Sequence, residues 1–137
     1  MKSKFRKTFK SIPHGKSSSP LFRHGTYGIQ SLQETRISQN LLETCRRKLR
    51  SSLNRKGKLW PRVYPDIPVT QKPSEVRMGK GKGSPKHWIA KVRKGQFLFE
   101  LEGINSYEAI KAFQSMQNKI GIKIKLIYDT KKFQTIY

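Results

Sequence analysis

Acidic residues and cysteines are scarce in this chain of 137 residues, and their scarcity excludes several classes of protein. The chain has 8 Asp and Glu residues, the first of them Glu34, and one cysteine, Cys45. A single cysteine forms no disulfide framework and no cysteine-based metal site, and the three histidines lack ligand spacing. We therefore expect no metal and no cofactor. We find no set of acid, base and nucleophile either, so we expect no enzyme.

Positive charge is what the chain has in excess. Its 30 Lys and Arg residues give a formal net charge of +22. Self-repulsion at this level disfavours a compact free chain, so we expect a polyanionic partner, with nucleic acid first, an anionic membrane second and an acidic protein third. Residues 1–94 hold 24 basic and 4 acidic residues, whereas residues 95–137 hold 6 and 4. The first two thirds of the chain therefore form the expected binding side.

A run in which glycine alternates with lysine is the most informative segment. It comprises Arg77, Met78, Gly79, Lys80, Gly81, Lys82 and Gly83. It has almost no apolar surface to bury, and its glycines allow the backbone to approach phosphates closely. The alternative of a mobile linker stays open on composition alone. A nucleotide-phosphate loop is excluded by spacing, because no Gly-x-x-x-x-Gly-Lys-Ser/Thr motif is present.

The first 25 residues show no hydrophobic period and are predicted to be a basic arm. Lysines and arginines alternate there with Phe5 and Phe9, a combination suited to phosphate pairing and base stacking. A disordered tail and an organellar transit peptide are the alternatives. We expect one domain over residues 26–128 and a short tail over residues 129–137.

Hydrophobic periodicity predicts an α+β domain with two helices on one small mixed or antiparallel sheet. The expected strands are residues 26–33, 58–64, 87–92, 96–101 and 122–126. Pro61 should place its strand at a sheet edge, and the turn 93–95 should join the strands on either side of it. The segment 65–85 has no period and is predicted to be a long loop that carries the Gly-Lys run.

The first helix is predicted over residues 38–55, with Ser38 as its N-cap and Gly57 as its C-cap glycine. Its apolar stripe comprises Ile37, Leu41, Leu42, Cys45, Leu49 and Leu53. Arg46, Arg47 and Arg50 lie on the opposite face and are expected to contact phosphate.

The second helix should begin at Asn105 or Ser106, with Glu108 completing a capping box, and end at Gly121. Its expected apolar face comprises Ala109, Ile110, Ala112, Phe113, Met116 and Ile120.

The chain contains a set of motifs at residues 69–73 (VTQKP), 75–83 (EVRMGKGKG), 4–7 (KFRK), 58–60 (KLW) with Arg62, 65–66 (PD) and 95–100 (GQFLFE). Together these motifs resemble those of the L-sixteen family of large-subunit ribosomal proteins. Pro61 departs from the family pattern, and the segment between residues 7 and 27 is shorter than in bacterial members. Residues 88–92 and 94–100 look more like mitochondrially encoded members.

The resemblance implies an α/β-hammerhead type of fold and a structural, non-catalytic role in the large ribosomal subunit. The implied partners are large-subunit rRNA, the tRNAs of the A and P sites, and neighbouring ribosomal proteins, with no membrane and no homo-oligomer. Residues 77–83 are expected near the peptidyl transferase region. The residues expected to bind rRNA are Lys4, Phe5, Arg6, Lys7, Lys10, Arg46, Arg47, Arg50, Arg55, Lys58 and Arg62.

Two alternatives accompany this interpretation. A basic RNA-binding factor outside the ribosome, such as an RNA chaperone, would have the same composition, but it would leave large subunits in a high-salt wash. The expected location is a mitochondrial ribosome, and the alternative location is the bacterial cytoplasm.

Overall fold

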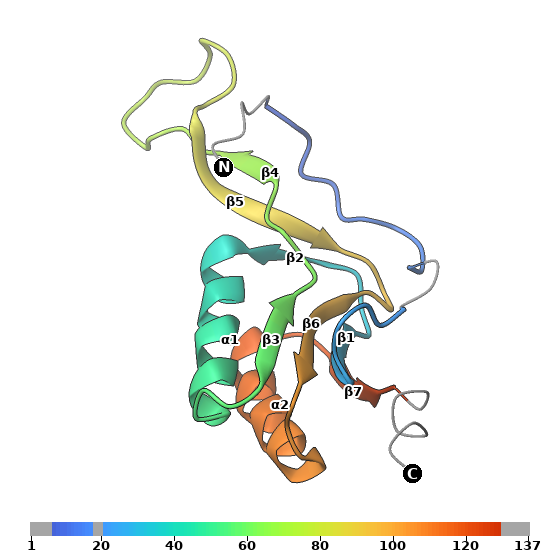
Figure 1. Cartoon of the computed structure of the whole chain (residues 1–137). Coiled ribbons are helices and arrows are strands. Elements are labelled where there is room, and N and C mark those ends of the chain that lie inside the picture. The colour runs from blue at the N-terminus through green and yellow to red at the C-terminus, as the bar shows by residue number, and fades with distance from the viewer. Residues whose placement is uncertain (1–6, 18–20, 130–137) are drawn as a thin grey trace.

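The structure is a computed structural model that describes residues 7–17 and 21–129, and these residues form two helices and two antiparallel sheets (Figure 1). The four-stranded sheet has the order β3-β6-β1-β7, with strands Lys58–Pro61, Phe97–Glu102, Tyr27–Ser31 and Ile124–Tyr128. The three-stranded sheet has the order β2-β5-β4, with strands Thr35–Ser38, Pro85–Val92 and Ile67–Thr70. The helices are α1 (Gln39–Ser52) and α2 (Ser106–Ile120). The predicted α+β class is confirmed.

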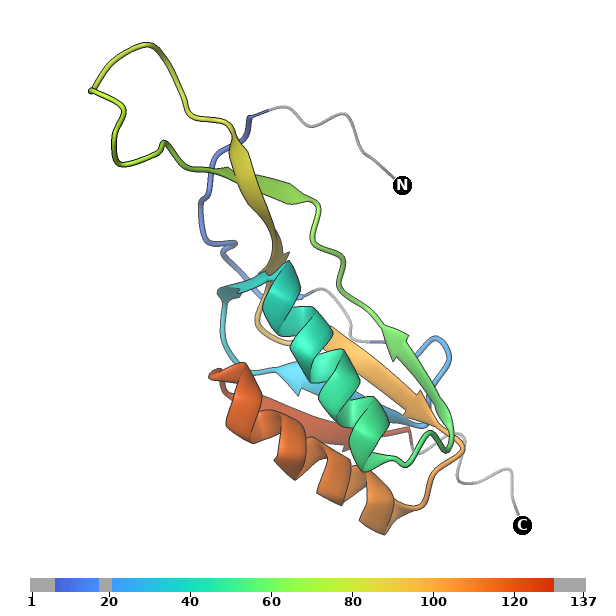
Figure 2. The ribbon, with the colours of Figure 1, turned by 90° about the vertical axis from the view of Figure 1, so that its left-hand side faces the viewer.

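Both helices lie side by side on one face of the four-stranded sheet, and the core fills the space between (Figure 2). The stripe predicted for the first helix is buried at Ile37, Leu42, Cys45, Leu49 and Leu53 and partly buried at Leu41. Burial raises the pKa of the Cys45 thiol to about 11, so this cysteine is an inert core side chain.

The start of α1 follows the prediction, but its end does not. Ser38 is the N-cap, and its hydroxyl accepts a hydrogen bond from the Leu41 amide at 3.3 Å. The helix ends at Ser52 with Leu53 as C-cap, because Asn54 and Arg55 have φ values of 48° and 63°. A left-handed pair cannot continue an α-helix, so the prediction that the helix reaches residue 55 with Gly57 as its cap is wrong.

Helix α2 has the predicted caps. Asn105 is the N-cap, its backbone amide donates to Glu108 Oε2 at 3.2 Å, and Gly121 ends the helix with a φ of 67°. Ala109, Ala112, Met116 and Ile120 are buried and Phe113 is partly buried. Ile110 is 48% exposed, so its assignment to the apolar face is wrong.

The division into two sheets differs from the single sheet that we predicted. Strands β5 and β6 belong to different sheets, so residues 93–96 carry the chain from one sheet to the other instead of closing a hairpin. Strand β2 was not predicted. Strand β4 lies inside the predicted loop 65–85, where Pro68 hides its pattern, and the irregular part is residues 71–84. Both Pro61 and Pro68 stand in edge strands, as a residue without an N–H donor should.

The burial of Leu49 allows a test of which face of α1 packs on the core. Leu49 is 0% exposed, so Leu49→Ala should lower the free energy of unfolding by about 2–5 kcal/mol, because the side chain's burial is removed and a cavity remains. Ile110→Ala removes the same kind of side chain from a half-exposed site and should cost less than about 1 kcal/mol. Urea unfolding of the purified chain measures both. Equal losses would show that the assignment of the buried face is wrong.

Candidate nucleic-acid interface

A fully buried carboxylate fixes the end of the basic arm on the four-stranded sheet. Glu100 in β6 is 0% exposed. It accepts hydrogen bonds from the backbone amides of Arg23 at 3.2 Å, His24 at 2.9 Å and Gly25 at 3.1 Å. The guanidinium of Arg62, which follows β3, donates to Glu100 Oε1, the oxygen that also accepts from the Arg23 amide, and forms an ion pair with the carboxylate. Five polar groups from three segments therefore meet at one point.

The environment of Glu100 keeps this carboxyl ionised. Burial alone would raise its pKa, but the amides of His24, Gly25 and Arg23 and the charge of Arg62 outweigh burial. The pKa of Glu100 is consequently below its ordinary value of 4.5. Because the folded-state pKa is depressed, Glu100 contributes stability above its unfolded pKa, and that contribution is lost as the pH falls through the folded pKa.

The preceding part of the arm lies along the three-stranded sheet (Figure 1). Arg36 donates to the Lys10 carbonyl at 2.5 Å, and Lys91 Nζ donates to the Ser11 hydroxyl at 3.1 Å. Further along, the Ser17 amide donates to the Lys94 carbonyl at 2.8 Å. The arm is therefore fastened at several points to the sheet from which the Gly-Lys run extends.

The segment 71–84 projects beyond the three-stranded sheet, away from the helices (Figures 1 and 2). Its base is closed by the Gln71 amide, which donates to the Ser84 carbonyl at 3.2 Å. Met78 is 101% exposed. We call this segment the Gly-Lys loop.

The glycines of this loop fall into two kinds. At Gly79 and Gly81 a Cβ atom would meet nothing within 4 Å, but their φ values of 102° and 79° strain any other residue. At Gly83 a Cβ atom would lie 2.9 Å from the backbone of Gln71 and Lys72. Gly83 therefore permits closure of the loop base, whereas Gly79 and Gly81 shape the exposed tip.

Arm and loop contact one another. Lys7 Nζ donates to the Lys82 carbonyl at 2.6 Å, and Lys82 Nζ donates to the Thr8 carbonyl at 2.8 Å. The Lys82 ammonium also lies 5.7 Å from the centre of the Phe9 ring, within cation–π range. Two predicted binding segments, residues 7–10 and 77–83, therefore form one continuous surface.

The arginines of α1 form a second basic area. Arg46, Arg47, Arg50 and Arg55, together with Ser51, line a depression of 280 Å³. The predicted exposure of this helix face is confirmed. In Figure 1, α1 starts beside β2 and runs away from the loop, so these arginines are not part of the arm-and-loop surface.

One acidic residue holds two of these arginines in place. Glu43 accepts from Arg46 Nε at 2.7 Å and from Arg47 Nε at 2.9 Å. Those bonds lower the pKa of Glu43 to about 2. The two guanidinium groups are thus held in place by one opposing charge.

The remaining predicted rRNA-binding residues have different placements. Lys58 is exposed at the start of β3. Arg62 is occupied by Glu100, with a side chain only 18% exposed. Lys4, Phe5 and Arg6 lie outside the described residues. The role of Glu100 was missed, although an acid between Phe99 and Leu101 in the apolar run of β6 is a signal that sequence reasoning can use.

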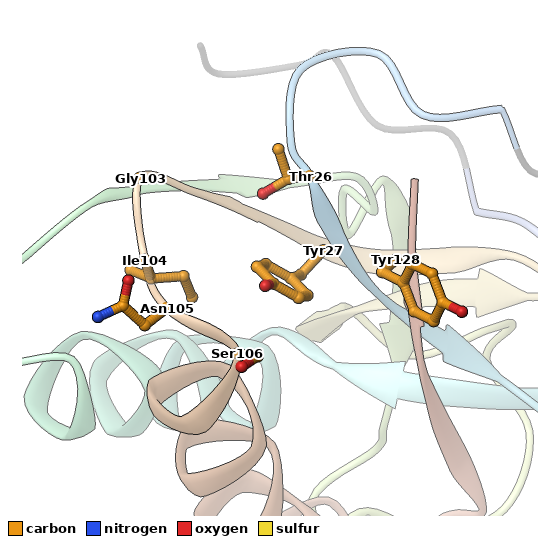
Figure 3. A pocket seen from close by; sticks show the side chains of 7 residues that line it. All are labelled: Thr26, Tyr27, Gly103, Ile104, Asn105, Ser106 and Tyr128. Atoms are coloured by element: carbon orange, nitrogen blue, oxygen red, sulfur yellow. The ribbon is translucent and has the colours of Figure 1, made fainter. Parts of the chain in front are cut away.

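A pocket of a different character lies at the far end of the four-stranded sheet. Figure 3 shows the ring of Tyr27 between Ile104 and Tyr128, above the start of α2. The cavity measures 770 Å³, and none of the seven described residues that line it carries a charge. It therefore does not extend the basic surface.

Other kinds of site are not found in the part of the chain that the structure describes. Residues 7–17 and 21–129 contain no group of three His, Cys, Asp or Glu side chains placed to hold a metal ion. Within the same ranges no helix has the length and apolarity needed to cross a membrane. A small α+β core with projecting basic segments defines a protein built to bind a polyanion.

Comparison with known proteins gives the family. The model of the family described as "Ribosomal protein L16p/L10e" matches residues 1–127. Large ribosomal subunit protein uL16 of Sphingopyxis alaskensis is 44% identical over 127 residues, which cover 92% of this chain and 89% of that protein. The proteins of the same name from Zymomonas mobilis and Buchnera aphidicola are each 40% identical, over 99% and 92% of this chain and 94% and 93% of their own lengths.

The chain belongs to the ribosomal protein L16p/L10e family. Its role is therefore structural, within the large ribosomal subunit, and it is not an enzyme. Ribosomal RNA and neighbouring ribosomal proteins are its partners.

The carboxylate that holds the arm predicts a pH-dependent effect. Glu100→Gln should lower the free energy of unfolding at pH 7 by about 1.5–3 kcal/mol, the range for hydrogen bonds to a charged group. The difference from the wild-type chain should shrink as the pH falls through the depressed pKa of Glu100, because the wild-type carboxyl then also becomes neutral. Urea unfolding from pH 7 down through this range measures the difference. A difference that is independent of pH would contradict an ionised Glu100.

The α1 arginines predict a change in salt dependence. Replacing Arg46, Arg47 and Arg50 by alanine should flatten the slope of log K against log salt for an rRNA fragment. The expected change is about 0.7–0.9 for each phosphate that the variant no longer neutralises. The matched control replaces Lys111, Lys119 and Lys123, three exposed cations of α2 and of the segment that follows it. An unchanged slope in the arginine variant would mean that this face is only solvated.

Proposed function

We propose that this chain binds large-subunit rRNA through its arm and its α1 arginines and presents the tip of the Gly-Lys loop to tRNA in the A and P sites. The observation that carries the proposal is the loop itself. It projects from the sheet and buries almost no apolar surface. It carries Arg77, Lys80 and Lys82 next to glycines, which have no side chain to cover the backbone amides. Such a segment contributes little to folding and suits close contact with a polyanion.

The contacts of the arm support different roles for Lys82 and Lys80 within the arm-and-loop surface. Lys82 is held by Thr8 and lies near Phe9, so it sets the position of the loop. Lys80 lies at the tip with a φ of 54°, between two glycines with open space around them. We assign the tRNA-facing role to Lys80 and its neighbours and the supporting role to Lys82.

The same surface supports a division of the chain into three parts. Residues 1–25 are the rRNA-binding arm, residues 26–128 are the single domain that displays arm and loop, and residues 129–137 are a tail. The relatives named above come from bacteria. A mitochondrial ribosome stays a prediction that is supported by residues 88–92 and 94–100. Co-sedimentation with organellar rather than cytoplasmic large subunits tests it.

The loop proposal predicts a defect in translation without a defect in assembly. Lys80→Ala, and separately Gly79→Val with Gly81→Val, should still join large subunits, because the arm and the α1 arginines remain. Peptide-bond formation should slow by about tenfold, equivalent to about 1.4 kcal/mol less transition-state stabilisation. The measurement is single-turnover peptide-bond formation on reconstituted ribosomes with matched occupancy of this protein.

The control for this experiment is Lys86→Ala, which removes the same charge at the start of β5 rather than at the tip. It should keep the wild-type rate. Wild-type rates in the tip variants would leave the loop as a linker, and failure of those variants to assemble would make it an rRNA anchor instead.

A further inference from the structure

A basic cavity lies where the arm, the end of β5 and the four-stranded sheet meet, and it takes in residues that the sequence did not single out. Its volume is 550 Å³. The polar side chains that line it are those of Ser17, Arg23, Arg62, Lys91, Arg93 and Gln96. We call it the junction cavity. It is separate from the Gly-Lys loop and from the α1 arginines.

The charge of this cavity is not balanced from within. Four cations line it, and the only carboxylate that touches any of them within the described residues is Glu100, whose oxygens are taken by Arg62 and the amides of residues 23–25. Within residues 7–17 and 21–129, Arg23, Lys91 and Arg93 have no carboxylate partner. Three cations held close together without a counter-ion favour an anionic ligand.

The lining favours a sugar-phosphate group over a base. Guanidinium groups match phosphate oxygens with paired donors, and the Ser17 hydroxyl and Gln96 amide suit a ribose hydroxyl. A volume of 550 Å³ exceeds what one phosphate needs and lies in the range of ligand pockets. The aromatic side chain in the lining, Phe97, is 3% exposed and packs on Phe22 with ring centres 4.8 Å apart. It offers no open face on which a base could stack.

We infer that the junction cavity binds a phosphodiester of the rRNA backbone together with its ribose, independently of base identity, and that the docked arm completes the site. Arg23 and Ser17 come from the arm, and the other polar lining residues come from the domain. Glu100 holds the amide of Arg23, so it acts as a positioning residue for this site without touching the ligand. The inference rests on the proposed binding of rRNA.

The test compares the full-length chain with two charge-matched variants on a transcript of the large-subunit rRNA. Arg23→Gln with Arg93→Gln removes two exposed cations of the cavity, and Lys111→Gln with Lys119→Gln removes two from α2. The cavity variant should flatten the log K against log salt slope by about 0.7–0.9, the value for one neutralised phosphate. The control should keep the wild-type slope. Equal slopes for all three chains, or equal flattening in both variants, would overturn the inference.

Ethylation of single phosphates in the transcript locates the contact. Wild-type binding should be blocked by ethylation at a small set of positions, and the cavity variant should become insensitive at one of them. Glu100→Gln should become insensitive at the same position while it keeps all four cations, a result that general destabilisation would not give. An unchanged pattern in the cavity variant would disprove the site.

Two further outcomes separate the possible sources of the anion. If inorganic pyrophosphate binds the free wild-type chain, this binding needs Arg93, and the ethylation pattern is unaffected, then the ligand is a free phosphate compound and the rRNA assignment is wrong. If the wild-type chain does not bind the transcript at all, the proposed function fails and the cavity assignment with it. Wild-type binding with no change in the cavity variant removes only the cavity assignment.

Discussion

One buried carboxylate fixes the end of the basic arm on the four-stranded sheet. An unpaired charge in a protein interior is costly, so Glu100 requires donors on every side. Arg62 supplies one, and the backbone amides of Arg23, His24 and Gly25 supply the others. Because those amides belong to the arm, satisfying the charge also fixes the path of the arm along the second sheet. The arm then reaches the Gly-Lys loop at Lys82.

Local patterns predicted the helices well, and non-local pairing explains the errors. Ser38, Asn105 and Gly121 cap helices as expected because capping depends on a few neighbouring residues. The strands on either side of residues 93–95 read as a hairpin, but each pairs with strands distant in sequence. Pro68 concealed β4 for a related reason. An edge strand tolerates proline, and nothing local shows which strand will be at an edge.

The candidate site likewise has a part that local sequence patterns predicted and a part that depends on the fold. The Gly-Lys loop is visible in the sequence because its composition excludes a core, and the α1 arginines are visible because they lie opposite an apolar stripe. Arg23 comes from the arm, whereas Lys91 and Arg93 come from the end of β5, about 70 positions later, so only the fold brings the arm residue to the other two. Likewise, the glycines of the loop look alike in the sequence but are required for different reasons. At Gly83 a Cβ atom would clash with the backbone of Gln71 and Lys72, whereas Gly79 has a positive φ angle that strains any other residue.

The bonds of the arm also impose an order on the synthesis of this chain. The arm's partners in the loop, in β5 and at Glu100 lie 74 to 80 positions further along the sequence. A nascent chain is made from its N-terminus, so the arm emerges long before these partners exist, and contacts of such high sequence separation form late in folding. During most of the synthesis of the chain, the positively charged arm therefore has no folded sheet to contact. During that interval RNA meets a flexible basic peptide, and only the finished chain presents the arm as a fixed surface.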